Sequence, residues 1–176
     1  MKISGVAWCL GDNVSTDEIL PGRYIGLEEG PELGSHALEG ISPAISSSMS
    51  RGDVLIGGHN FGTGSSRESA PKALRSAGFS AVVAESFARI FYRNCINIGL
   101  VALWCEGVTE AVNEGDSVVI DLLDSRLLVE ATTVSLPLLP LSPFAHQIVD
   151  SGGLVPYAKS RLGRSLVSDS EHWGSA

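Results

Sequence analysis

The chain has 176 residues, of which 44% are hydrophobic and 18% charged, and this composition is typical of a folded globular protein rather than a disordered one. Its formal net charge of -8 at pH 7 argues against nucleic-acid binding or binding to an anionic membrane as its main function. Small metabolites and protein partners are therefore the favoured ligands.

The cysteines and the N-terminus bear on the cellular location. Cys9, Cys95 and Cys105 are odd in number, lack CxxC spacing and lie inside apolar runs, which indicates buried thiols in a reducing compartment. The first residues, MKISGVAWCLGDN, lack the long apolar segment of a signal peptide. No stretch approaches the ~20 apolar residues of a membrane helix. We therefore expect a cytoplasmic protein.

The first third of the chain contains one clear element. Residues 3–10, ISGVAWCL, have the pattern of a strand, and the small polar residues that follow indicate a turn. Residues 26–52 mix glycine, proline and serine, so we expect mainly surface loop there, with one short helix near residues 31–38.

The middle of the chain alternates between strands and helices. Residues 53–58, 79–86 and 100–105 have the apolar runs of buried strands. A first helix is expected to have Ser66 as its N-cap and to end at Gly78, and a second to end at Gly99. This β-α-β-α-β order predicts an α/β core with parallel pairing.

The rest of the chain is expected to complete a single domain over residues 1–163. Residues 115–123 and 126–136 resemble a pair of strands, and residues 142–163 two short helical segments. The serine-rich residues 164–176 are predicted to be a flexible tail.

Residues 57–69, GGHNFGTGSSRES, are the most informative stretch. A glycine-rich turn before a helix exposes backbone N–H groups to an anion, and Arg67 adds a fork that can hold a carboxylate. The lysine of a phosphate-binding loop and the third glycine of a dinucleotide fingerprint are both absent. The alternative is structural, because glycine and serine before a helix often form only a turn and a cap.

Two long motifs in the right order resemble signatures of the aconitase superfamily's mobile domain. They are GDNVSTDEILPGRY and GGHNFGTGSSRES followed by AVVAESFARIFYRNCINIGL. The resemblance implies an α/β fold: a single swivelling β/β/α domain with a mixed sheet and flanking helices. Within the superfamily, the chain is most similar to the family of separate small subunits of 3-isopropylmalate dehydratases.

The resemblance implies reversible dehydration of a malate-type 2-hydroxy acid, here the isomerisation of 2- and 3-isopropylmalate in leucine biosynthesis. Ser65 matches the family's catalytic base, and Asp17 the acidic turn that supports the catalytic groups. The residues matched to substrate binding are Gly64, Ser66, Arg67 and Thr16. Other readings stay open, because Asp17 and Thr16 are also good caps for the segment after them, and Glu68 is suited to closing a cap or pairing with Arg67.

The resemblance also implies a cofactor that this chain does not hold. Family enzymes use a [4Fe–4S] cluster bound by three cysteines, whereas the cysteines here have no cluster spacing. We therefore expect a large catalytic subunit to carry the cluster and this chain to bind no metal. The four histidines lack metal-ligand spacing. Arg89 and Arg93, spaced i and i+4, are expected to add positive potential on one helical face.

Substrate choice is expected to depend on Gly26 and Leu27. Homoaconitase-like relatives have an arginine shortly after the matched tyrosine, and this chain has RYIGLEEG there. Without that cation an apolar substituent is favoured over a further carboxylate. The alternatives are another alkylmalate, homoaconitate, or a noncatalytic regulatory module. Thr63 replaces a cysteine common in relatives, and we expect activity to survive the change.

Overall fold

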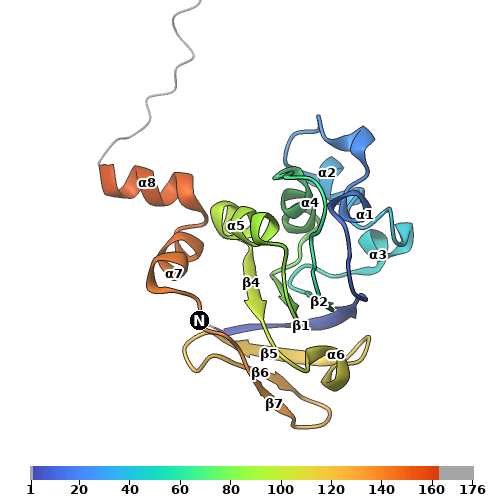
Figure 1. Ribbon diagram of the computed structural model, residues 1–176, viewed down its shortest axis with the longest axis vertical. Coiled ribbons are helices and arrows are strands. Elements are labelled where there is room, and N and C mark those ends of the chain that lie inside the picture. The colour runs from blue at the N-terminus through green and yellow to red at the C-terminus, as the bar shows by residue number, and fades with distance from the viewer. Residues whose placement is uncertain (1, 163–176) are drawn as a thin grey trace, which may run out of the picture.

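The computed structural model describes residues 2–162, which form one mixed seven-stranded sheet flanked by helices (Figure 1). The strand order is β4-β3-β2-β1-β5-β6-β7, with parallel pairing from β1 to β4 and antiparallel pairing from β1 through β5 and β6 to β7. The strands are β1 (Lys2–Cys9), β2 (Val54–Gly57), β3 (Ala81–Ala84), β4 (Val101–Trp104), β5 (Ser117–Asp121), β6 (Arg126–Val129) and β7 (Ser135–Pro137).

The parallel half confirms the predicted β-α-β-α-β order. Helix α4 (Ser69–Ala77) connects β2 to β3, and α5 (Arg89–Ile98) connects β3 to β4. Both helices end at a glycine in the left-handed region, Gly78 with φ 117° and Gly99 with φ 83°, as the sequence predicts. All residues of β2 and β3 are buried, because helices or other strands cover both faces of this half.

Side chains alternate between the two faces of the parallel strands and so build two cores. Ile56 and Val83 pack on one face with the antiparallel strands, α6 (Val108–Ala111) and α7 (Pro143–Asp150). Leu55 and Val82 pack on the other face with the cluster that includes residues of α4 and α5. Figure 1 shows α4 and α5 on one side of β1 and the antiparallel strands β5 to β7 on the other.

The segment 26–52 is more ordered than expected. It contains α2 (Pro31–Ser35) and α3 (Pro43–Ser48), and Leu33, Ala37 and Leu38 are buried in the core. Gly34 allows this packing, because a Cβ atom at that position would lie 2.5 Å from the carbonyl carbon of Ser76 on α4. The expected helix near residues 31–38 is present but ends at Ser35.

Three further boundaries differ from the sequence expectation. Helix α4 begins at Ser69 with Glu68 at the N-cap position, so the predicted cap at Ser66 was wrong. Residues 126–136 form two antiparallel strands, β6 and β7, instead of one. The short α1 (Thr16–Ile19), α6 and the 3-10 helix η1 (Gly22–Tyr24) were not predicted.

The C-terminal part of the described chain contains the two expected helical segments, α7 and α8 (Leu154–Leu162). The predicted tail, residues 164–176, lies outside the described residues. Within residues 2–162, no helix combines the length and hydrophobicity needed to span a membrane.

Candidate active site

The loop between β2 and α4 is fixed at its base by a buried aromatic side chain. Phe61 is fully buried, with ring centroids 6.1 Å from Phe87 and 5.6 Å from Phe91. Its backbone N–H donates to the Ser86 carbonyl at 2.9 Å. Gly62 follows with φ 77°, and a Cβ atom there would lie 2.0 Å from the Phe91 ring. The loop therefore leaves the sheet in one defined direction that requires glycine.

A second set of contacts joins this loop to the N-terminal motif. The N–H groups of Gly62 and Thr63 donate to the Val14 carbonyl at 2.8 and 3.2 Å, and Thr16 N–H donates to the Thr63 carbonyl at 2.8 Å. The buried Thr16 hydroxyl donates to the Ser65 carbonyl at 3.4 Å. The two motifs quoted from the sequence are thus brought side by side.

Helix α1 is capped by Ser15 rather than by Thr16 or Asp17. Ser15 and Glu18 form a reciprocal capping box, in which Glu18 N–H donates to Ser15 Oγ at 3.2 Å and Ser15 N–H donates to Glu18 Oε2 at 2.7 Å. The alternative role of Asp17 as a cap was therefore wrong. Its side chain is free to pair with a group outside the helix.

Asp17 forms an ion pair with Arg67, fifty positions along the chain. The Asp17 side chain is 58% exposed and that of Arg67 25%, so the pair lies at the surface of the loop junction. A Cβ atom on Gly22 would lie 3.9 Å from Arg67 Nη1, which places η1 against the same pair. Glu68 pairs with Lys72 instead of Arg67.

The tip of the loop is exposed at Gly64. Ser65 and Ser66 are both exposed. Within residues 2–162, the backbone N–H groups of Gly64, Ser65 and Ser66 have no hydrogen-bond acceptor. These N–H groups and hydroxyls, together with the adjacent Arg67 guanidinium, are suited to binding a carboxylate. The α4 dipole contributes less than the sequence implied, because the helix starts at Ser69.

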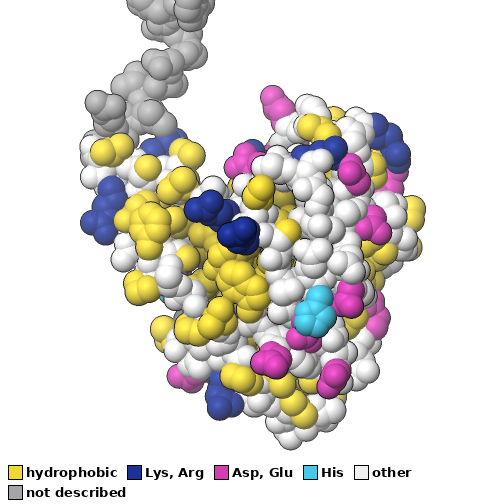
Figure 2. Space-filling view, viewed as in Figure 1, with side chains coloured by type: hydrophobic (Ala, Val, Ile, Leu, Met, Phe, Trp, Pro, Cys, Tyr) yellow, Lys and Arg dark blue, Asp and Glu magenta, His cyan; other side chains and the backbone are white. Residues whose placement is uncertain are grey.

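A cleft of about 700 Å³ opens beside this loop. Gly62, Thr63, Gly64 and Ser65 form part of its lining, and the rest comes from α5 and the end of β4. Figure 2 shows basic side chains within a broad apolar area on one face of the molecule. Sequence reasoning identified Arg89 and Arg93 but missed Tyr92 and Trp104, whose rings lie 4.0 Å apart. Burial raises the pKa of Tyr92.

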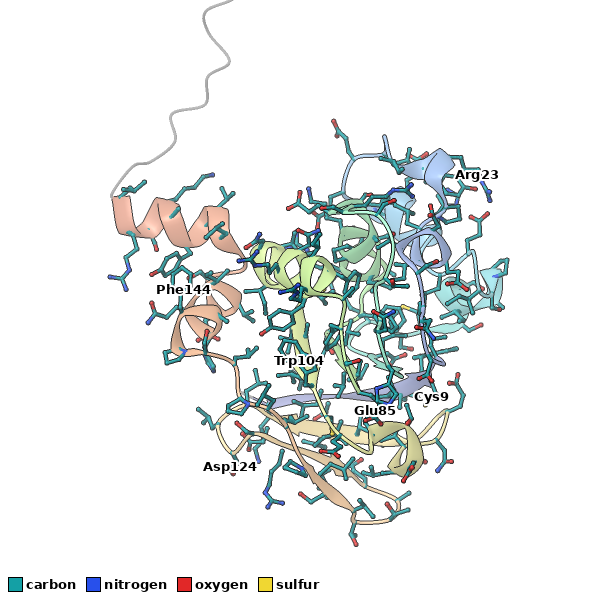
Figure 3. The ribbon with its side chains drawn as sticks, in the orientation of Figure 1. Cys9, Arg23, Glu85, Trp104, Asp124 and Phe144 are labelled. Carbon is teal, nitrogen blue, oxygen red and sulfur yellow. The ribbon has the colours of Figure 1, made fainter. Side chains whose placement is uncertain are left out.

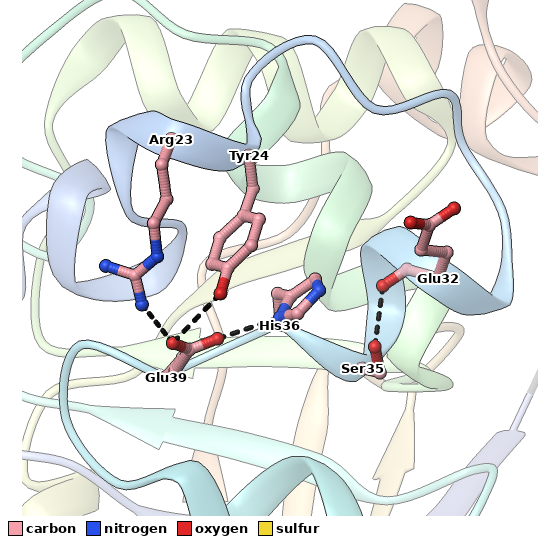
Figure 4. A network of polar contacts seen from close by, with 6 residues as sticks. All are labelled: Arg23, Tyr24, Glu32, Ser35, His36 and Glu39. Atoms are coloured by element: carbon pink, nitrogen blue, oxygen red, sulfur yellow. Dashed lines mark hydrogen bonds and ion pairs between the residues drawn. The ribbon is translucent and has the colours of Figure 1, made fainter.

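A polar network, also missed from the sequence, fixes the turn that follows η1 (Figure 4). Glu39 accepts a hydrogen bond from the Tyr24 hydroxyl at 3.2 Å, contacts His36 Nδ1 at 2.8 Å and pairs with Arg23. The Tyr24 and His36 rings stack with centroids 3.6 Å apart. The contacts to His36, Tyr24 and Arg23 lower the pKa of the Glu39 carboxyl. The network therefore holds the start of the segment that contains Gly26 and Leu27.

The two expected specificity positions differ in environment. Gly26 is exposed, and a Cβ atom there would have no neighbour within 4 Å. Leu27 is half-buried and packs against the core cluster that contains Leu33 and Leu38. Any contact between this turn and a ligand substituent is therefore expected at Gly26 rather than at Leu27.

The cysteines and histidines of residues 2–162 do not converge on a common point. Cys9 lies on β1, Cys95 on α5 and Cys105 after β4, and burial raises the thiol pKa of Cys9 and of Cys105 to about 11. Separated, protonated thiols do not fit the three thiolates that an iron–sulfur cluster requires. His172 lies outside the described residues.

Comparisons with known proteins identify the family of the chain. The aconitase C-terminal domain family matches residues 46–106. A 3-isopropylmalate dehydratase small subunit of Halothermothrix orenii is 45% identical over 162 residues, which cover 92% of this chain and 98% of that one. The isopropylmalate/citramalate isomerase small subunit of Methanocaldococcus jannaschii is 44% identical, with 93% and 97% covered.

A solved structure gives the same result for the fold. The crystal structure of a 3-isopropylmalate dehydratase from Methanocaldococcus jannaschii superposes with a TM-score of 0.88 at 40% identity, over 92% of this chain and 96% of that one. The mixed sheet with flanking helices expected from the motifs is thereby confirmed. With relatives this similar over nearly their whole length, the chain belongs to the 3-isopropylmalate dehydratase small-subunit family of the aconitase superfamily.

Proposed function

We propose that this chain is the small subunit of a two-subunit hydro-lyase that interconverts 2-isopropylmalate and 3-isopropylmalate in leucine biosynthesis. The observation that supports the proposal is the junction of the two motifs: Arg67 of one motif pairs with Asp17 of the other, and Ser65, two residues before Arg67, lines the cleft. The names of the relatives supply the reaction class. The substrate is a dicarboxylate, and the exposed N–H groups and the guanidinium have the matching charge.

Ser65 is proposed as the base. Isomerisation removes a proton from the carbon next to a carboxylate, while the hydroxyl leaves the neighbouring carbon, and water then adds back with the opposite regiochemistry. A serine oxygen can accept that proton only where its anionic form is stabilised. The free N–H groups of residues 64–66 and the nearby Arg67 supply this stabilisation once the exposed loop is covered.

The other matched residues have positioning or binding roles in this proposal. Arg67 and Ser66 hold a substrate carboxylate, together with the N–H of Gly64. Asp17 orients the Arg67 guanidinium through the ion pair. Thr16 fixes the backbone at Ser65 through its hydrogen bond to the Ser65 carbonyl.

The active site is proposed to be completed by a large subunit. Ser65 and Ser66 are exposed in this chain, and proton abstraction from a weakly acidic carbon needs a site closed from water. Since residues 2–162 offer no thiolate set, the [4Fe–4S] cluster of the family is assigned to that partner. The reduced cysteines and the metabolic role favour the cytoplasm as the location.

Isopropylmalate is the preferred substrate in this proposal, and citramalate is the second candidate. Gly26 leaves its surroundings open, and neither Gly26 nor Leu27 provides a cation for the further carboxylate of a homoaconitate-type substrate, which favours an apolar substituent. Citramalate is considered because one relative is named an isopropylmalate/citramalate isomerase small subunit. A noncatalytic regulatory module is not favoured, because the relatives are dehydratase and isomerase subunits.

Co-production with the large subunit of the same organism tests the proposal. The complex is expected to convert 2-isopropylmalate into 3-isopropylmalate, detected by chromatography, while this chain alone does not. Citramalate serves as the competing substrate. A complex that assembles with its cluster intact but leaves isopropylmalate unchanged would contradict the assignment.

A further inference from the structure

Five residues on the α5 and β4 side of the cleft form what we call the arginine-aromatic surface: Arg89, Ile90, Tyr92, Arg93 and Trp104. Arg89, Ile90 and Arg93 are exposed, and Ile90 retains 51% of its accessible surface. Trp104 lies at the end of β4 (Figure 3), and its ring packs against Tyr92. Figure 2 shows basic side chains within a broad apolar area of this face.

The two arginines are placed where they do not stabilise the isolated chain. Neither forms an ion pair within residues 2–162. Arg89 is the first residue of α5, where the helix dipole disfavours a cation. Arg93 is one turn later on the same face, so the two like charges repel. Nearby carboxylates from another molecule would reverse both effects.

The charge of the surface contrasts with that of the whole chain. The protein has 20 acidic and 12 basic residues, yet no acidic residue is among the described residues that line this cleft. Arginine, tyrosine and tryptophan are also the residues most enriched at the energetic centres of protein interfaces. The surface therefore combines a local positive charge with the aromatic groups that interfaces use.

The position of the surface indicates which molecule covers it. It lines the same cleft as Ser65, and under the proposed function that cleft is completed by the large subunit. A dicarboxylate alone would leave the exposed Ile90 uncovered.

We propose that the arginine-aromatic surface is the docking site for an acidic segment of the large subunit. Carboxylates of that segment pair with Arg89 and Arg93, and an apolar side chain packs on Ile90 and the Tyr92–Trp104 pair. This inference rests on the proposed function, because it requires the large subunit as partner. It assigns binding of the large subunit to the arginine-aromatic surface, and proton abstraction and carboxylate binding to residues 64–67.

A charge-reversal variant tests the inference. Arg89→Glu combined with Arg93→Glu is titrated against the tagged large subunit of the same organism at low and high salt. The dissociation constant is expected to rise at least ~10-fold at low salt, and its salt dependence to weaken, because attraction is replaced by repulsion. The matched control combines Arg51→Glu with Arg126→Glu, two exposed arginines outside the cleft lining, and makes the same change in net charge.

The outcomes separate the inference from the proposed function. Circular dichroism and thermal unfolding establish that each variant is folded, and Ile90→Ser provides a second variant without a charge change, expected to weaken association. If the double variant and Ile90→Ser bind as tightly as wild type, the inference is overturned while the proposed function stands. A raised Michaelis constant with unchanged association would assign the arginines to substrate and also overturn it. If the wild-type chain does not bind the large subunit, the proposed function fails and the inference with it.

Discussion

Replacing Gly64 by alanine tests whether the conformation of the loop positions Ser65. Gly64 has φ 102°, which L-residues rarely adopt, and an added Cβ atom would lie 3.2 Å from the Thr16 Oγ1 atom. A residue held in such a region costs ~1–3 kcal/mol. The loop cannot relax freely, because Thr63 is hydrogen-bonded to the N-terminal motif just before it. Either the folded state loses this free energy or the backbone at Ser65 moves.

Both consequences are measurable. For a chain of this size, ~1 kcal/mol corresponds to about 2–4 °C in the midpoint of thermal unfolding, so a decrease of ~2–12 °C is expected. If the backbone moves instead, a displacement of the Ser65 hydroxyl by about 1 Å is expected to lower turnover of the reconstituted complex by ~10²-fold. Gly11→Ala is the control, because Gly11 has no neighbour within 4 Å of an added Cβ and no positive φ. Gly64→Ala with the stability and turnover of Gly11→Ala would refute the reasoning.

Three further changes test other parts of the account. Arg67→Lys in the complex should reduce the specificity constant by ~10- to 100-fold, mainly through the Michaelis constant, since a point charge replaces a bidentate fork; an unaltered Michaelis constant would remove Arg67 from substrate binding. Gly26→Arg should shift the ratio of specificity constants from isopropylmalate toward a malate with a carboxylate-ended chain by ~10- to 100-fold, and an unchanged ratio would show that this turn does not contact the substituent. The buried Cys105 thiol, with its pKa raised to about 11, should resist alkylation at pH 8 in the folded chain. A thiol whose pKa is higher in the folded chain than in the unfolded chain stabilises the folded state below the unfolded-state pKa. The free energy of unfolding should therefore fall between about pH 9 and 11, and Cys105→Ala should make it depend less on pH in that range.

The parallel half of the fold is predictable because its signals are local. Its strands are short apolar runs, and its helices end at Gly78 and Gly99, the positions where a left-handed residue is needed. The start of α4 was missed because hydrogen bonds to the distant Val14 hold the preceding loop, and these outweigh the local capping preference of Ser66. The ordered segment 26–52 was missed for a similar reason, since its helix α2 depends on packing against α4.

In the candidate site too, the features within one motif were predictable from the sequence, and those that depend on contacts between distant residues were not. Ser65 and Arg67 lie two positions apart in one motif, so the sequence alone indicates an anion site there. The pairing of Arg67 with Asp17 bridges fifty positions and was not predicted; the family resemblance implied only that the Asp17 turn supports the catalytic groups. The contact between Tyr24 and Glu39 and the contribution of Trp104 to the cleft were not predicted, because each joins residues that are well separated in the sequence.

The central claim is that this chain donates the base, Ser65, to an active site that it shares with a large subunit. The turnover number of the Ser65→Ala complex tests this claim most directly. Since the side chain is exposed, we expect unfolding free energy within ~0.5 kcal/mol of wild type and unchanged assembly, while turnover falls by ~10²–10⁴-fold. Near-normal turnover in a fully assembled Ser65→Ala complex would contradict the account.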